Sequence, residues 1–174
     1  RMLAKLPSDV IVTPMEGDDS GLACLIVLKD FLQCDDKQFE DMFELGEPKK
    51  PQSIKMFGKE VELPRRQVVH GEPYEFAGFS DEPKSLEDMH SVLLRAYNKF
   101  KALFPWCGYN TVLANYYPPG GYIGKHSDDE PSMKKQPIIS GTFCPTGSSR
   151  RMQFTPKKHV KGSRLMLSLR NGDV

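Results

Sequence analysis

The spacing of apolar residues predicts both helices and strands in the first part of the chain. Apolar positions with helical spacing indicate helices over residues 37–45 and 85–104. The run LACLIVL at residues 22–28 is short and partly β-branched, which predicts a buried strand. Residues 54–57 and 67–69 are shorter runs of the same type, and they predict two further strands.

The longest predicted helix has a recognisable start and end. Ser85 can accept a hydrogen bond as its N-cap, and Glu87 and Asp88 suit the positive end of the helix dipole in its first turn. Pro105 ends it, because proline has no N–H to continue the helical hydrogen bonds.

The pattern changes after this helix. Four strand-like runs follow at short intervals, at residues 111–116, 137–143, 152–155 and 163–169, with Gly, Pro and Ser turns between them. Helices followed by many short strands predict an α+β fold, with an antiparallel sandwich or jelly roll supported by helices on one side.

Composition and charge narrow the possible classes of protein only slightly. A chain of 174 residues is long enough for one domain with a sizeable core. Its 4 cysteines contain no CxxC pair, which argues against a zinc ribbon and favours reduced thiols. The net charge is only +1, but residues 145–170 contain basic residues and no acid. That run is either a solvated face or a surface for phosphates.

The stretch NYYPPGGYIGKHSDDEP, at residues 115–131, contains the most suggestive chemistry. His126 and Asp128 are two residues apart, so in an extended segment both side chains point to the same side. A His-x-Asp pair with one distant histidine forms the metal triad of non-haem Fe(II) oxygenases. A polar surface loop is the alternative. Calcium is disfavoured, because the stretch lacks the ligand pattern and central glycine of an EF-hand.

The surroundings of this pair resemble those of a known family. Asn115-x-Tyr117 precedes a Pro-Gly-Gly turn, and PIISGTF and RRMQF follow the His-x-Asp pair. Further upstream, IKMFGKEVELPRRQVVHGEPYEFAGF at residues 54–79 contains an FGK…PRxQ pattern. Together these segments resemble the AlkB-type dioxygenases, which depend on Fe(II) and 2-oxoglutarate, and most closely the branch that repairs duplex DNA. The resemblance spans most of residues 22–174.

The resemblance implies a fold and a domain organisation. We expect a double-stranded β-helix, or jelly roll, with N-terminal supporting helices and a β-hairpin that forms a finger or lid. Residues 1–174 would form one domain, with a nucleotide-recognition extension over residues 22–104 and the jelly-roll core over residues 105–174. The later metal histidine and two arginines that clamp 2-oxoglutarate would lie beyond Val174, since His159 comes too early. We therefore expect this stretch alone to be inactive.

The resemblance also assigns site residues. His126 and Asp128 would bind Fe(II), and Asn115 and Tyr117 would contact 2-oxoglutarate. The pocket for a flipped base would contain the aromatic residues Tyr74 and Phe76 and the acids Asp129 and Glu130. The residues that contact DNA would be Met56, Phe57, Gly58, Arg65 and Arg66. Each aromatic residue could instead be a core residue, and each acid or arginine a solvated surface charge. His70 departs from the family pattern, which often has tyrosine there.

The implied activity is oxidative demethylation of N-methylated bases in DNA, such as 1-methyladenine or 3-methylcytosine, by base flipping. Double-stranded DNA would be the preferred partner of a monomeric protein without membrane association, located inside the cell and in the nucleus. Three alternatives stay open. The first is an RNA or nucleotide N-demethylase, the second is a jelly roll that binds nucleic acid without catalysis, and the third is a cupin-like domain without a metal.

Overall fold

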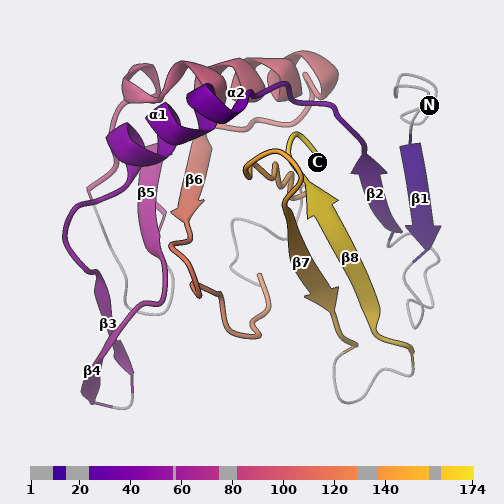
Figure 1. Cartoon of the computed structure of the whole chain (residues 1–174). Coiled ribbons are helices and arrows are strands. Elements are labelled where there is room, and N and C mark those ends of the chain that lie inside the picture. The colour runs from indigo at the N-terminus through magenta and orange to yellow at the C-terminus, as the bar shows by residue number, and fades with distance from the viewer. Residues whose placement is uncertain (1–9, 15–23, 57, 75–81, 129–136, 157–161) are drawn as a thin grey trace. The chain divides into compact units, whose positions relative to one another are not determined.

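The computed structural model describes residues 10–14, 24–56, 58–74, 82–128, 137–156 and 162–174 (Figure 1). The chain divides into two compact units. The terminal unit contains Arg1–Phe39 and Ile139–Val174, and the central unit contains Glu40–Ile138. Among the described residues, no helix is long and apolar enough to cross a membrane.

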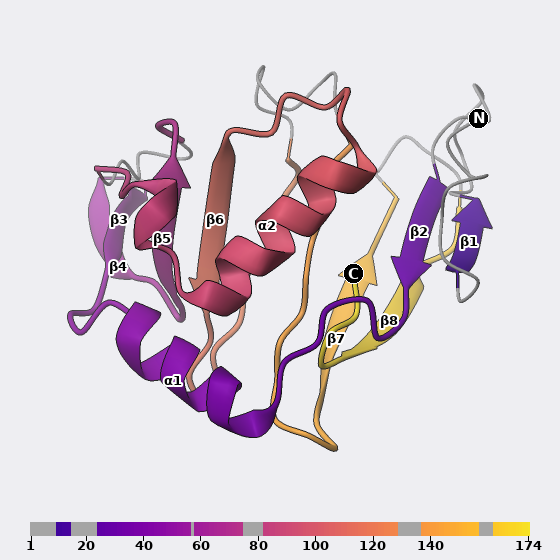
Figure 2. The same cartoon turned by 90° about the horizontal axis from the view of Figure 1, so that it is seen from above.

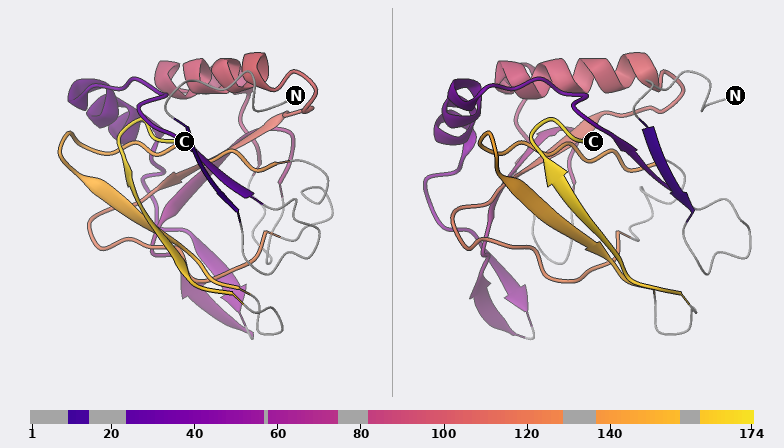
Figure 3. Two further views of the ribbon diagram at one scale, coloured as in Figure 1. Left: turned by 90° about the vertical axis from the view of Figure 1, so that its right-hand side faces the viewer. Right: turned by 45° about the vertical axis from the view of Figure 1, so that its right-hand side comes forward.

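The described residues of the central unit form two antiparallel strand pairs and two helices. Helix α1 (Asp36–Gly46) enters the unit from the terminal one, and the rest of the unit comprises β3 (Ser53–Met56), β4 (Lys59–Glu62), β5 (Arg66–Gly71), the 3₁₀ turn η2 (Leu86–Asp88), α2 (Ser91–Leu103) and β6 (Thr111–Tyr116). Strand β3 pairs with β4, and β5 pairs with β6. The β3–β4 hairpin extends away from the β5–β6 pair (Figure 3).

One face of the β5–β6 pair carries the core of the central unit. Val68 of β5 lies opposite Ala114 of β6, and both pack with Tyr116 against Phe43 of α1 and Leu93 of α2. The rings of Phe43 and Tyr116 meet edge to face, with centroids 5.7 Å apart. Figure 2 shows α2 running along this pair of strands. Because side chains alternate between the faces of a strand, the residues next to Val68 and Ala114 point to the opposite face.

The long predicted helix is interrupted. Ser85 caps the short turn η2, where its Oγ accepts a hydrogen bond from the Glu87 N–H at 3.2 Å. Met89 and His90 then adopt extended backbone angles, and α2 begins only at Ser91. His90 takes over the capping role, because its Nδ1 accepts from the Val92 N–H at 3.3 Å. The prediction of one helix from residue 85 was therefore wrong, although the end near Pro105 was right.

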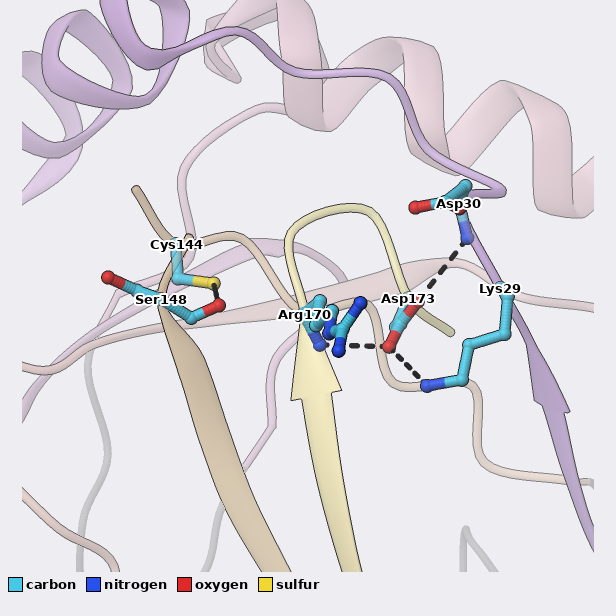
Figure 4. Close-up of polar contacts among 6 residues, drawn as sticks. All are labelled: Lys29, Asp30, Cys144, Ser148, Arg170 and Asp173. Carbon is cyan, nitrogen blue, oxygen red and sulfur yellow. Dashed lines mark hydrogen bonds and ion pairs between the residues drawn. The ribbon is translucent and has the colours of Figure 1, made fainter. Parts of the chain in front are cut away.

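In the terminal unit, the described residues form two more antiparallel pairs. Strand β1 (Val10–Pro14) pairs with β2 (Cys24–Leu28), and β7 (Ser149–Phe154) pairs with β8 (Leu165–Arg170). The chain end joins the first pair, since Leu28 and Val174 exchange two backbone hydrogen bonds at 2.7 and 3.0 Å. Asp173, only 1% exposed, is held there by Lys29, Asp30 and Arg170 (Figure 4).

Most of the predicted strands are present, but one is not. No strand forms at residues 137–143, where Thr142 makes only isolated backbone hydrogen bonds with Gly172 and Asp173. Strands β1 and β4 were not predicted. Helices combined with antiparallel strands confirm the mixed fold class, and the described ladders are two-stranded. Cys34, Cys107 and Cys144 are free thiols, as expected.

Gly71 provides a test of the β5–β6 packing. Its φ is +92°, and an added β-carbon would overlap the carbonyl oxygen of Asn110. We expect Gly71→Ala to lower the free energy of unfolding by about 3 kcal/mol, from backbone strain plus overpacking. Gly120→Ala is the matched control, because φ is +79° there but no atom lies within 4 Å. Equal losses in urea denaturation of the two variants would contradict the steric argument.

Candidate metal centre and its surroundings

The segment that carries His126 is anchored by a tight turn. After β6, the Gly121 N–H donates to the Pro118 carbonyl at 2.7 Å, and the Tyr122 N–H donates to the Pro64 carbonyl at 3.2 Å. A β-carbon on Gly121 would lie 2.7 Å from that same Pro64 oxygen, so the close approach requires glycine. The turn thus attaches the segment to the chain immediately before Arg65.

His126 and Asp128 point toward one another. The His126 Nε2 lies 3.3 Å from the Asp128 Oδ1, and the two side chains are 49% and 43% exposed. Two ligand atoms at about 2.1 Å from one metal ion, placed at right angles, lie roughly 3 Å apart. The separation of these two atoms therefore suits adjacent positions around a single ion.

The orientation of the imidazole also suits metal binding. The His126 Nδ1 lies 2.8 Å from the Gly124 carbonyl oxygen, which can only accept a hydrogen bond. The proton is therefore on Nδ1, which donates to this carbonyl. A hydrogen bond of this kind to a backbone carbonyl commonly orients metal-binding histidines. In the neutral ring, Nε2 then presents its lone pair toward a carboxylate, which is favourable only with a cation between them. The alternative is a charged imidazolium that forms a simple ion pair.

Two protein ligands are fewer than the three of a facial triad. Within the described residues, no group of three His, Cys, Asp or Glu side chains is arranged to hold a metal ion. His70 is not a candidate, because it is buried and its Nδ1–H donates to the Ser85 carbonyl at 3.0 Å. The nitrogen and oxygen donors of the pair fit Fe(II) as part of a ligand set.

The residues predicted to contact 2-oxoglutarate lie on the strand that leads into this segment. Asn115 is half-buried in β6, and Tyr117 follows the strand on the same side. The Asn115 Oδ1 accepts a hydrogen bond from the Arg65 Nε at 3.0 Å. Burial lowers the pKa of the Arg65 guanidinium, and the nearby Tyr117 phenol partly opposes that shift.

The two predicted DNA-contacting arginines occupy different environments. Arg66 forms an ion pair with Glu47, with 2.7 Å between Nη1 and Oε1, and its side chain is 28% exposed. Arg65 is only 7% exposed, which favours an enclosed ligand over a DNA phosphate. Their contacts with DNA stay predictions.

The remaining predicted residues belong to the hairpin and the base pocket. Met56 ends β3 and pairs with Lys59, and Gly58 in the turn has a φ of +77°. Tyr74 is half-buried after β5. Phe57, Phe76, Asp129 and Glu130 lie outside the described residues. The roles of all these residues in binding DNA or a base stay predictions.

Gln67 is a polar residue that the sequence analysis did not single out. It is 0% exposed, and its register partner across the sheet is Asn115. The one available signal was an amide beside the apolar run at residues 68–69, directly after two arginines. Nothing in that pattern indicated that the Gln67 side chain would lie on the same face of the strand pair as Asn115.

Comparison with known families defines the class of protein. A model of the 2OG-Fe(II) oxygenase superfamily matches residues 28–174. The chain belongs to this superfamily and is an Fe(II)- and 2-oxoglutarate-dependent dioxygenase, with both groups as its cofactors. No curated protein matches the chain.

Proposed function

We propose that this dioxygenase demethylates N-methylated bases in DNA, such as 1-methyladenine and 3-methylcytosine. The observation that carries the proposal is the 3.2 Å hydrogen bond between the Tyr122 N–H and the Pro64 carbonyl. It joins the segment of the candidate metal ligands to the chain that leaves the β3–β4 hairpin, where the FGK pattern lies. A hairpin that enters a base stack and a metal centre that oxidises the flipped base would have to lie on connected elements.

We also propose that the chain is an AlkB-type dioxygenase and that it belongs to the branch that repairs duplex DNA. The fold would be a single-domain double-stranded β-helix with supporting helices, in which the β3–β4 hairpin is the finger. The protein would act as a monomer on double-stranded DNA inside the nucleus. The motif order Asn115-x-Tyr117, His126-x-Asp128 and the upstream FGK…PRRQ supports this assignment.

When bound, Fe(II) and 2-oxoglutarate supply the oxidising chemistry with O₂. His126 and Asp128 would hold the metal, with the His126 ring oriented by the Gly124 carbonyl. Asn115 and Tyr117 would bind and orient the co-substrate from the end of β6. The reaction would convert the N-methyl group to a hydroxymethyl group, with succinate and CO₂ as the other products. The hydroxymethyl product then breaks its N–C bond and releases formaldehyde and the repaired base.

The substrate would be presented as a flipped base. Tyr74 and Phe76 would form the aromatic walls of the base pocket, because a base outside the helix needs a replacement for its lost stacking. Asp129 and Glu130 would accept hydrogen bonds from the exocyclic amine, which adenine and cytosine carry and thymine lacks. Met56, Phe57 and Gly58 would fill the gap in the duplex as an apolar wedge, with Arg66 near a phosphate.

The hairpin gives the test of substrate class. With a duplex and a single strand carrying the same methylated base, we expect Phe57→Ala to lower succinate and formaldehyde formation on the duplex by about tenfold, because an apolar wedge offsets part of the cost of unstacking the duplex. Activity on the single strand should change less than twofold. Val61→Ala is the matched control, since Val61 is 42% exposed on β4 of the same hairpin.

Three results would count against the proposal. Equal losses on duplex and single strand would remove the duplex assignment. Faster turnover of methylated RNA or free nucleotides than of DNA would indicate the RNA or nucleotide demethylase. DNA binding without any succinate formation, in the full-length protein supplied with Fe(II) and 2-oxoglutarate, would leave only a nucleic-acid-binding module.

A further inference from the structure

Four polar residues share the face of the β5–β6 pair opposite the core. Gln67 and Asn115 are directly opposite each other in the antiparallel register, on the strand positions that alternate with Val68 and Ala114. Arg65 lies two residues before Gln67, and Tyr117 lies two residues after Asn115. Opposed residues of an antiparallel pair have their β-carbons about 5 Å apart, so the amides of Gln67 and Asn115 are neighbours.

Two members of this group have unmet polar requirements. Gln67 is 0% exposed, yet neither its Nε2 nor its Oε1 has a hydrogen-bond partner among the residues that the structure describes. Arg65 is 7% exposed, and no carboxylate of a described residue lies within ion-pair distance of it, in contrast to the adjacent Arg66. Buried amides and buried cations are nearly always paired in folded proteins. An orphaned amide beside an uncompensated arginine indicates a missing anionic or carbonyl-bearing ligand.

The hydrogen bond between Arg65 and Asn115 determines what this face offers to such a ligand. A guanidinium can only donate, so the Asn115 atom that lies 3.0 Å from the Arg65 Nε must be the amide oxygen. The Asn115 Nδ2 donors are then directed elsewhere. Donors from Asn115, Gln67 and the rest of the guanidinium together suit a carboxylate.

We propose that Arg65 and Gln67 belong to the 2-oxoglutarate site, where Arg65 holds the Asn115 amide in its binding orientation and Gln67 donates to the co-substrate. This inference rests on the proposed role of Asn115 and Tyr117 as co-substrate contacts. It moves Arg65 from the DNA surface to the interior of the enzyme. A DNA phosphate is the less suitable occupant, because Arg65 is only 7% exposed and does not lie on an open surface that a duplex backbone could follow.

The first test replaces Arg65 with lysine, which keeps the charge but loses the Nε donor and the planar fork. Calorimetric titration of 2-oxoglutarate into the full-length protein loaded with Mn(II), which replaces Fe(II) without turnover, measures the affinity directly. We expect the Kd for 2-oxoglutarate to rise about tenfold or more, as for a lost charge-assisted hydrogen bond. The affinities for Mn(II) and for methylated DNA should change less than twofold. Arg95→Lys, an exposed arginine on α2, is the matched control.

The second test uses Gln67→Leu, a change of similar volume. A merely structural glutamine would lose hydrogen bonds and lower the thermal stability of the ligand-free protein. An amide without partners has none to lose, so we expect the Tm without 2-oxoglutarate to stay the same or rise. The Kd for 2-oxoglutarate should nevertheless increase about fivefold to tenfold, and the stabilisation by saturating 2-oxoglutarate should shrink accordingly.

The outcomes separate this inference from the proposed function. If the wild-type protein binds 2-oxoglutarate and both variants bind it with unchanged affinity, the inference is wrong while the proposed function stands. If Arg65→Lys weakens only DNA binding, Arg65 contacts DNA and the inference fails. If Asn115→Ala and Tyr117→Phe leave 2-oxoglutarate affinity unchanged, the proposed co-substrate contacts fail, and this inference fails with them.

Discussion

Replacing His126 with alanine is expected to reduce the formation of succinate from 2-oxoglutarate by more than about a hundredfold, because a metal ion contributes several kcal/mol of stabilisation to the reactions it assists. The His126 Nε2 is one of two donor atoms that lie 3.3 Å apart, and its loss leaves the Asp128 carboxylate as the remaining donor of the pair. Anaerobic Fe(II) titration should show the same loss as weakened metal binding, so the effect does not depend on turnover alone.

His90→Asn is the matched control for this experiment. His90 caps α2 through its Nδ1, and asparagine is also a good N-cap, so both folding and Fe(II) affinity should be preserved. Asp128→Asn removes the charge of the second donor but keeps its shape, and it should weaken Fe(II) binding in the same direction as His126→Ala. Fe(II) affinity that survives both His126→Ala and Asp128→Asn would show that the pair is a surface ion pair only.

Replacing Asp173 with alanine is expected to cost about 3 kcal/mol of unfolding free energy, because it leaves two backbone N–H groups without their acceptor and removes the ion pair with the partly exposed Lys29. Its Oδ2 accepts from the Lys29 Nζ at 2.6 Å and from the Arg170 N–H at 2.8 Å, and its Oδ1 accepts from the Asp30 N–H at 3.3 Å (Figure 4). These contacts connect the end of β8 to the segment after β2. Urea denaturation at neutral pH measures the loss.

The same carboxylate predicts how stability depends on pH. Burial alone raises the pKa of Asp173, but the hydrogen bonds from Arg170, Lys29 and Asp30 outweigh it, and the net shift is downward. A carboxyl group with a lowered pKa in the folded state stabilises the protein above its ordinary pKa, and this contribution is lost as the pH falls through the folded-state value. Wild-type protein should therefore lose more stability in acid than the Asp173→Ala variant.

Asp173→Asn is the control that separates charge from shape. It retains an acceptor for the backbone N–H groups but loses the ion pair with Lys29, so its loss at neutral pH should be smaller than that of Asp173→Ala. It should also show the same weakened acid dependence. If both variants unfold at the wild-type urea concentration, the network around Asp173 contributes nothing to stability.

Local patterns were enough where short-range forces decide the structure. Strand β2 and helix α1 were both predictable, because the spacing of apolar residues along the sequence indicates which face of each element is buried. The pair His126 and Asp128 was identifiable for the same reason, since spacing by two places both side chains on one side. The family match then confirmed the class of enzyme and its cofactors.

Other features depended on partners distant in the sequence. The predicted helix from residue 85 breaks at Met89 and His90. His90 caps a second helix, and the apolar spacing around it gave no sign of that break. The predicted strand at residues 137–143 does not form, although residues 10–14 and 59–62, which were not predicted as strands, do pair. Strand formation requires a neighbour with unpaired backbone groups, and a single segment does not reveal one.

The amino-acid sequence by itself indicated the class of chemistry, because the two predicted metal ligands lie two residues apart and the motifs around them are contiguous. Only the tertiary structure decided that Arg65 is buried against Asn115 and that Gln67 lies opposite Asn115, with a side-chain amide that has no hydrogen-bond partner among the described residues. These relations join residues about fifty positions apart, and they arise from the register of two antiparallel strands, which hydrogen bonding and core packing select together.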